Sequence, residues 1–70
     1  MTKFKIEAGA NNTRAIIGKQ IQGCETLDDV AQSLAFEGSF FHDWFIYRGG
    51  NHVAVHTHEG TPRCALITIA

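Results

Sequence analysis

The spacing of apolar and polar residues changes along this chain, and each change predicts a different element. From Lys3 to Ala8, charged and apolar residues alternate with period two, which is typical of a strand with one buried face. The residues 9–12 favour a turn, and the β-branched run Thr13–Ile17 then predicts a second strand that can continue past Gly18. Together the two runs predict an amino-terminal hairpin.

Between Thr26 and Gly38 the spacing becomes that of an amphipathic helix. Its apolar residues recur at intervals of three and four and form one stripe, which comprises Leu27, Val30, Ala31, Leu34 and Ala35. Thr26 can cap the start of the helix, Asp28 and Asp29 suit the positive end of its dipole, and Gly38 is a natural stop. We therefore expect one side of this helix to pack and the other to face solvent.

The stretch Ser39–Gly60 is rich in aromatic and β-branched residues and contains all four histidines. Gly49 and Gly50 separate two such runs, which predicts a β-hairpin. The apolar run Cys64–Ile69 predicts a last strand. The order is then β-β-α-β-β-β, so we expect residues 1–70 to form a single α+β domain, with a twisted antiparallel sheet of about five strands and one helix packed on one face.

The register of the central hairpin decides which residues share a face of the sheet. A two-residue Gly49-Gly50 turn pairs Tyr47 with His52 and Asp43 with His56, and it leaves one face to Phe41, Phe45, Tyr47, His52, His56 and His58. A three-residue turn pairs Tyr47 with Val53 and leaves that face to His42, Trp44, Ile46, His56 and His58. We favour the first register, because it places Trp44, Ile46, Val53 and Val55 under the helix stripe.

Size and charge narrow the classes of function. A chain of 70 residues is near the lower limit at which one apolar core suffices, and its net charge of −1 argues against binding nucleic acid by charge. No apolar run approaches the roughly 20 residues that span a bilayer, and no leader pattern opens the chain, so we expect a cytoplasmic protein. Cys24 and Cys64 are expected as buried reduced thiols, with one disulfide as the alternative.

The histidines raise the possibility of a metal site. His56 and His58 lie on the same side of a predicted strand roughly 7 Å apart, a spacing from which two imidazoles can share a zinc ion. Asp43 in the first register, or His42 in the second, would supply a third ligand. No further pattern of metal-site spacing accompanies them, so we favour polar surface histidines over a structural zinc site, and we expect no cofactor.

The sequence gives little support to an enzyme. Neither cysteine lies in a Gly-rich elbow or at a helix start, the settings that lower a thiol pKa, and there is no phosphate-binding loop. A chain of this size also has little room for a pocket of useful volume. We therefore expect a binding protein.

Scattered matches point to a family. They are Gly18-Lys19-Gln20-Ile21, Thr26-Leu27, the helix that bears Ala31, Phe41-His42, the aromatic hairpin and Glu59-Gly60, and together they resemble the small phage-encoded anti-CRISPR proteins of the type I-F inhibitor group. The resemblance implies an inhibitor that binds the crRNA-guided surveillance complex in the bacterial cytoplasm and obstructs its use of target DNA. The related protein has basic residues on its helix where this chain has Asp28, Asp29 and Glu37, so no binding residue is carried over.

The candidate binding surface is the sheet face away from the helix, where large side chains exceed what one helix can cover. The candidate partner-binding residues are Phe45, Tyr47, His52, His56 and His58, with Arg14 and Lys19 as contacts for phosphate or an acidic surface. We expect a protein or ribonucleoprotein partner, no membrane and no direct binding of nucleic acid. The alternatives are a homo-oligomer that buries this face against its own copy, the zinc-binding domain, and a face that the amino-terminal segment or a loop covers.

Overall fold

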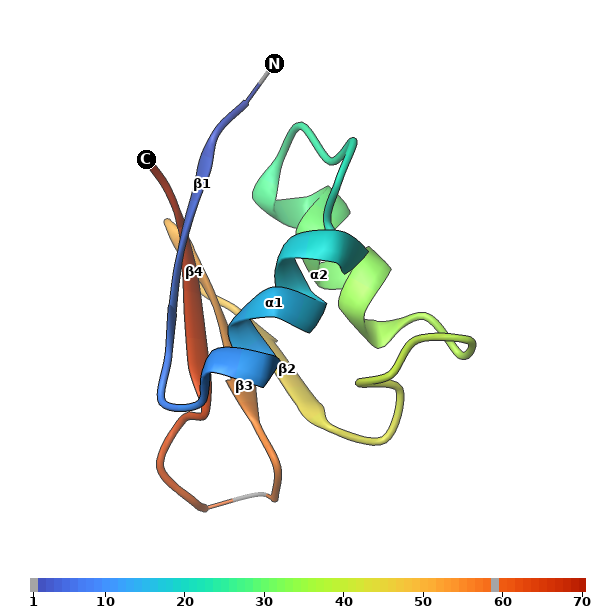
Figure 1. The fold of residues 1–70 in the computed structure, drawn as a ribbon, viewed down its shortest axis with the longest axis vertical. Coiled ribbons are helices and arrows are strands. Elements are labelled where there is room, and N and C mark those ends of the chain that lie inside the picture. The colour runs from blue at the N-terminus through green and yellow to red at the C-terminus, as the bar shows by residue number, and fades with distance from the viewer. Residues whose placement is uncertain (1, 59) are drawn as a thin grey trace.

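The computed structural model describes residues 2–58 and 60–70, and it places a sheet on one side and two helices on the other (Figure 1). The elements are β1 (Phe4–Ala8), α1 (Asn11–Gln20), α2 (Leu27–Ala35), β2 (Phe45–Arg48), β3 (His52–His56) and β4 (Ala65–Ile69). The α+β class and the antiparallel sheet are confirmed. The prediction of about five strands and one helix is wrong, because the described residues form four strands and two helices.

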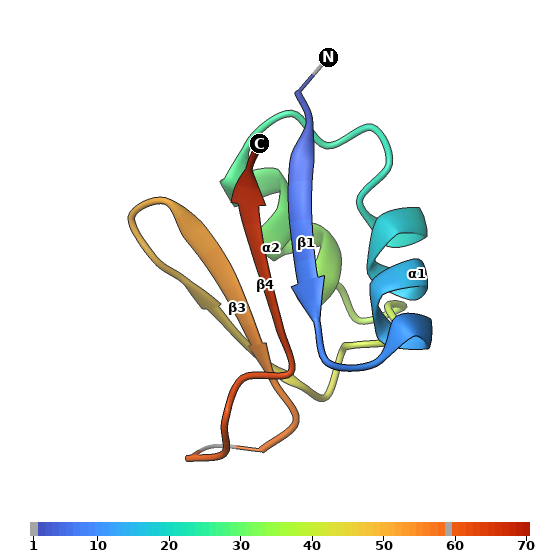
Figure 2. The ribbon, with the colours of Figure 1, turned by 60° about the vertical axis from the view of Figure 1, so that its left-hand side comes forward.

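The strands lie in the order β1-β4-β3-β2, and every neighbouring pair is antiparallel. β2, β3 and β4 follow one another as a meander, and β1 joins at the far side of β4, so β1 and β2 are the two edges of the sheet. Figure 2 looks onto the face away from the helices, with α2 behind the strands. The predicted first and last strands are confirmed as β1 and β4, which pair with each other through Ile6 and Ile67.

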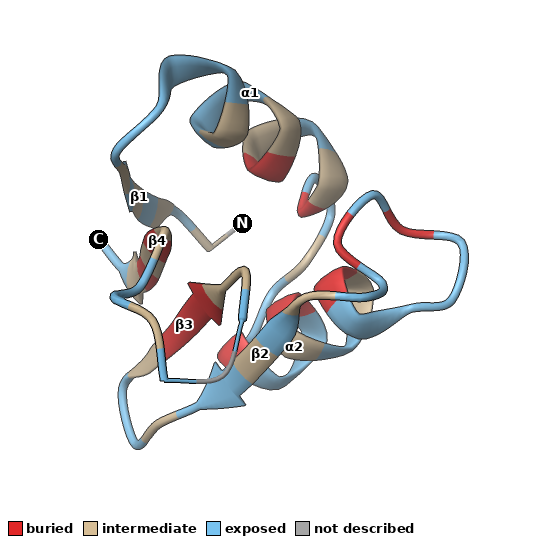
Figure 3. Ribbon diagram, turned by 90° about the horizontal axis from the view of Figure 1, so that it is seen from below, coloured by how far each residue is buried: buried red, intermediate tan, exposed pale blue. Residues whose placement is uncertain are grey.

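The core lies between the strands and the two helices. Its fully buried side chains are Ile17, Val30, Leu34, Phe41, Val53, Val55 and Ile67. Figure 3 shows β3 as a mostly buried strand and β2 as a mostly exposed one. Phe41 was predicted on the outer face, which is wrong: it has no exposed surface and meets Trp44 edge to face at 4.9 Å between ring centroids.

The segment Thr13–Ile17 was predicted as a strand and lies instead in α1. Ile17 and Ile21 stand one helical turn apart, both are buried, and the helix packs against β1. Burying these two side chains outweighs the strand preference of their β-branched type. Only Gly9 and Ala10 separate β1 from α1, so the amino-terminal unit is a strand followed directly by a helix.

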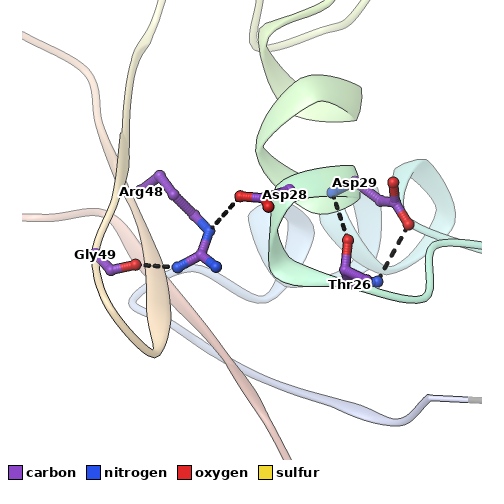
Figure 4. Close-up of polar contacts among 5 residues, drawn as sticks. All are labelled: Thr26, Asp28, Asp29, Arg48 and Gly49. Carbon is purple, nitrogen blue, oxygen red and sulfur yellow. Dashed lines mark hydrogen bonds and ion pairs between the residues drawn. The ribbon is translucent and has the colours of Figure 1, made fainter.

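The predicted amphipathic helix is α2, and Thr26 caps it as expected. Thr26 Oγ1 accepts a hydrogen bond from the Asp29 N–H at 3.1 Å, and the Asp29 carboxylate accepts one from the Thr26 N–H at 3.2 Å (Figure 4). This reciprocal pair is a capping box. The helix ends at Ala35, three residues before Gly38, because Phe36 already has extended backbone angles.

Neither α1 nor α2 has the length and apolar character needed to cross a membrane, as far as the described residues go.

The central hairpin is confirmed, but both predicted registers are wrong. Tyr47 stands opposite Ala54, and Phe45 stands opposite His56. The turn is Gly50-Asn51, which is closed by the Gly49 N–H donating to His52 O at 2.8 Å. A displacement of two positions keeps every side chain on its face, so the favoured interpretation still placed Ile46, Val53 and Val55 inside and Phe45, Tyr47 and His56 outside.

Three contacts explain why the turn lies one residue later than predicted. Arg48 belongs to β2, and its Nε donates to Asp28 Oδ1 at 2.9 Å, which ties this end of the strand to α2 (Figure 4). Its Nη1 also donates to Gly49 O. The His52 ring lies over Gly49, where a Cβ atom would overlap it. Gly49 therefore follows the last strand pair, Arg48 and Val53, and precedes the two central residues of the turn.

Candidate functional site

The sheet face away from the helices changes in character from one edge to the other. In one cross-strand row, Tyr47 of β2 is followed by Ala54 of β3, Leu66 of β4 and Glu7 of β1. At the β1 edge the face is charged, and Lys5 and Glu7 form an exposed ion pair at 3.2 Å. The large apolar surface of this face is therefore concentrated on the hairpin.

Phe45, Tyr47 and His56 form one group of rings on this face, which we call the hairpin cluster. The Phe45 and Tyr47 rings are stacked with centroids 6.5 Å apart, and Tyr47 meets His56 edge to face at 5.3 Å. Phe45 is 39% exposed and Tyr47 45%, large fractions for aromatic residues in strands. Each side chain comes from a paired position of β2 or β3, so the backbone fixes the spacing of the rings.

A hydrogen bond holds the imidazole of His56 in place. Its Nδ1 lies 2.8 Å from Thr61 O, and because a carbonyl oxygen can only accept, Nδ1 carries the proton. In the neutral ring, Nε2 is then a hydrogen-bond acceptor. Thr61 is itself held by its hydroxyl, which donates to His58 O at 2.6 Å. The hairpin cluster thus combines exposed ring surface with a fixed polar group.

The structure brings some of the other predicted residues to this face and leaves others apart. His52 lies on the same face at the turn end of the hairpin, with its Nδ1 3.3 Å from Asn51 Oδ1. His58 follows β3 in a turn and is exposed. Arg14 and Lys19 lie on α1, which packs against β1 at the opposite edge of the sheet. They do not belong to the hairpin surface.

The part of the chain that the structure describes does not have the geometry expected for a zinc site. Phe45, and not Asp43, stands opposite His56, and Nδ1 of His42 lies 3.0 Å from Ser39 O. Within residues 2–58 and 60–70, no three or more His, Cys, Asp or Glu side chains are placed to hold a metal ion. The third-ligand positions predicted for the two registers are therefore wrong.

Both cysteines are free and half-buried. Burial raises the pKa of the Cys24 thiol, and the Asp29 carboxylate adds to the increase, while a hydrogen bond with Ser33 acts in the opposite direction. A raised pKa keeps the thiol protonated at neutral pH, and the protonated form is a poor nucleophile. The local electrostatics of Cys24 are thus the reverse of those of an activated cysteine.

Two exposed features escaped the sequence analysis. Phe36 is 64% exposed and Phe40 58% exposed, both in the connection after α2. The only sequence feature that indicated this exposure is that Phe40 is next to Phe41, in a stretch with more large apolar residues than one core can bury. The second feature is a groove of about 570 Å³ between β1 and the end of α1, lined in part by Phe4, Ile6 and Ile21. It was missed because Gly18–Ile21 was assigned to a strand.

Comparisons of the chain with protein-family models, with curated proteins and with solved structures give no match. The interpretation of the site therefore rests on its own geometry. That geometry is an exposed group of rings on a sheet face that neither helix covers, at one edge of the sheet.

Proposed function

We propose that this protein acts by binding another protein through the hairpin cluster. The observation that carries the proposal is that Phe45 and Tyr47 are stacked, exposed and fixed on the face that the helices leave open. Tyrosine and phenylalanine are enriched in the cores of protein interfaces, because they bury a large area and have few torsion angles to order. The Tyr47 hydroxyl and His56 Nε2 add polar groups that can fix the orientation of a partner.

The packing of the hairpin supports the same proposal. Three consecutive residues of β3 are buried, namely Val53, Ala54 and Val55. A hydrogen bond from Arg48 to Asp28 joins β2 to α2. A surface that is already ordered loses little conformational entropy when it binds. A small domain with such a cluster of exposed rings is suited to blocking a site on a larger partner.

A bacterial surveillance complex is the partner that we propose to test first. The resemblance to type I-F inhibitors implies it, and inhibition by occlusion needs only a rigid surface of matching shape and no chemical step. The contacts would come from the hairpin cluster and His52. Arg14 and Lys19, at the other edge of the sheet, would not take part in the same contact.

A pull-down tests this proposal. The tagged protein is mixed with a bacterial lysate that contains an active type I-F surveillance complex, beside a Tyr47→Ala, His56→Ala double variant and a Gln32→Ala control on the exposed side of α2. We expect the native protein and the control to capture the complex. The double variant should capture it at least about tenfold less well, because central aromatic residues carry most of the energy of an interface.

Capture by the double variant at the level of the native protein, with both folded, would show that the hairpin cluster is not the contact. Sedimentation of the isolated protein tests the alternative that this face forms a homo-oligomer. A dimer that the double variant converts to a monomer would show that this face binds a second copy. That result, together with no capture of the complex, would overturn the proposal.

A further inference from the structure

The opposite edge of the sheet has a separate feature, the unpaired side of β1. The pairing of β1 with β4 is bounded by two hydrogen bonds, from the Gly9 N–H to Cys64 O at 3.3 Å and from the Ala70 N–H to Lys3 O at 3.0 Å. The residues that form these bonds, Lys3 and Gly9, flank β1 at odd-numbered positions, and hydrogen-bonded pairs alternate along an antiparallel strand. The N–H and C=O groups of Phe4, Ile6 and Ala8 therefore point away from β4, toward the open edge.

A groove lies beside this edge. It occupies about 570 Å³ between the inner face of β1 and the carboxyl-terminal part of α1, and its apolar lining includes Phe4, Ile6 and Ile21. Gly18 and Ile6 both line the groove and lie next to each other, since a Cβ atom on Gly18 would be at ordinary contact distance, 3.9 Å, from Ile6 Cδ1. An additional strand beside β1 would direct alternate side chains into this groove and the others onto the outer face.

The charges at this edge are mostly positive, with Glu7 as the acidic exception. Lys5 lies on the outer face of β1, Lys3 immediately precedes the strand, and Arg14 is one helical turn before Gly18 on the same side of α1. The only acidic residue among the first 20 is Glu7, which already pairs with Lys5. Two copies joined through their β1 edges would bring these lysines together, and lysine on an edge strand disfavours such pairing. A segment with acidic residues would instead be attracted.

We propose that β1 accepts an extended segment of a partner protein as an additional strand. The segment would alternate apolar residues, which enter the groove between β1 and α1, with acidic residues, which lie beside Lys3 and Lys5. This site goes beyond the proposed function. It uses the other edge of the sheet and shares no residue with the hairpin cluster, so either site can fail without the other.

Fluorescence anisotropy with a labelled peptide that alternates valine and glutamate tests this site. A peptide of the same pattern with lysine in place of glutamate is the charge control. A third peptide carries N-methyl groups on alternate backbone amides, which removes donors to β1 without changing the side chains. We expect the glutamate peptide to bind and the other two to bind at least about tenfold more weakly, because strand addition depends on main-chain hydrogen bonds as well as side-chain charge.

Two variants test the groove in the native fold. Gly18→Leu extends a side chain into the groove, while Gly18→Ala adds one methyl group at ordinary contact distance and serves as its matched control. The leucine variant should bind the glutamate peptide about tenfold more weakly than the alanine variant, since the groove is then filled. The Tyr47→Ala, His56→Ala variant should bind the peptide as the native protein does.

Hydrogen exchange provides a readout that follows the strand pairing directly. On adding the glutamate peptide, the amides of Phe4, Ile6 and Ala8 should become protected, whereas those of Lys5 and Glu7, which already face β4, should change little. Equal binding of the lysine peptide would overturn the proposal, as would the absence of alternating protection. Displacement of the peptide by a single-stranded oligonucleotide, or a dimer joined through β1, would show a different occupant and would also overturn it.

Discussion

At the scale of single residues, Thr26 and Asp29 fix where α2 begins. Each side chain accepts a hydrogen bond from the backbone N–H of the other, and Asp29 also accepts one from the Glu25 N–H at 3.2 Å. The sequence predicted the Thr26 cap, because a threonine followed by an apolar stripe is a local signal. It did not predict the orientation of Asp29, which depends on where the chain enters the helix.

Replacement of Thr26 by alanine should lower the free energy of unfolding by about 1 kcal/mol, because an N-cap hydroxyl is lost. Urea denaturation followed by circular dichroism measures the change. Gln32→Ala, on the exposed side of the same helix, should change the free energy by less than about 0.5 kcal/mol. Equal effects of the two substitutions would be inconsistent with a specific cap.

The carboxyl of Asp29 should make the stability depend on pH. Hydrogen bonds from the Glu25 and Thr26 N–H groups hold its pKa below the ordinary value of 3.8. A lowered pKa in the folded state stabilises the fold above the unfolded value, and this contribution is lost as the pH falls through the folded value. Asp29→Asn should therefore destabilise the protein at neutral pH, with a difference from the native protein that narrows at low pH.

Acid titration of the unfolding free energy for the two proteins measures this difference. Asp43→Asn, which removes an exposed carboxylate from the connection before β2, is the control for the loss of one negative charge. A difference between the Asp29→Asn variant and the native protein that stayed constant down to the lowest pH would contradict the assigned hydrogen bonds.

At the scale of elements, α1 shows where local sequence signals fail. Thr13, Ile16 and Ile17 are β-branched, and Ala10 at the helix start provides no side-chain cap. The local pattern therefore favoured a strand. The helix forms because Ile17 and Ile21 are buried against the rest of the core, and that contact cannot be read from the segment alone. In contrast, α2 has both an apolar stripe and a cap, and it was predicted correctly.

Substitutions at Gly18 and Gly23 test whether this segment is a helix or a strand. Gly18 lies inside α1, and a methyl group there would meet only Ile6 at ordinary contact distance, so Gly18→Ala should raise the free energy of unfolding by about 0.5 to 1 kcal/mol. Gly23 has a φ of 87°, so Gly23→Ala should lower it by about 1 kcal/mol. Thermal denaturation of both variants provides the test, and a destabilising Gly18→Ala would count against α1.

For the central hairpin, the sequence predicted which residues share a face but not which residues pair. Alternation alone assigned Phe45, Tyr47 and His56 to one face and Ile46, Val53 and Val55 to the other, because any even displacement of register preserves the faces. The pairing itself depends on Arg48 reaching α2 and on the His52 ring lying over Gly49. Neither contact could be predicted before the helix had been placed beside the strand.

At the scale of the whole molecule, four of the six basic residues lie near one edge of the sheet and the hairpin cluster lies near the other. Lys5 lies on β1, Arg14 and Lys19 lie on α1, and Lys3 immediately precedes β1, whereas the hairpin cluster lies on β2 and β3. The sequence showed the early cations but had no means of placing them away from the aromatic residues. The groove beside β1 became visible only when the second helix was found.

A core of this size leaves little margin of stability. Phe41 is completely buried, and Phe41→Ala should cost about 3 to 5 kcal/mol, which is comparable to the whole stability of a small domain. The variant should be largely unfolded at physiological temperature by circular dichroism. Phe40→Ala is the matched control, since its ring is 58% exposed and its loss should leave the fold intact. Similar melting curves for the two variants would contradict the assignment of Phe41 to the core.

The central claim is that the hairpin cluster is the binding surface, and hydroxyl-radical footprinting of the captured complex tests it most directly. The method reports the solvent exposure of each aromatic side chain, free and bound. The exposed rings of Phe36 and Phe40, on the connection after α2, are internal controls in the same molecule. We predict that Phe45 and Tyr47 become protected on capture while Phe36 and Phe40 do not. Protection of Phe36 and Phe40 with Phe45 and Tyr47 unchanged would contradict the account.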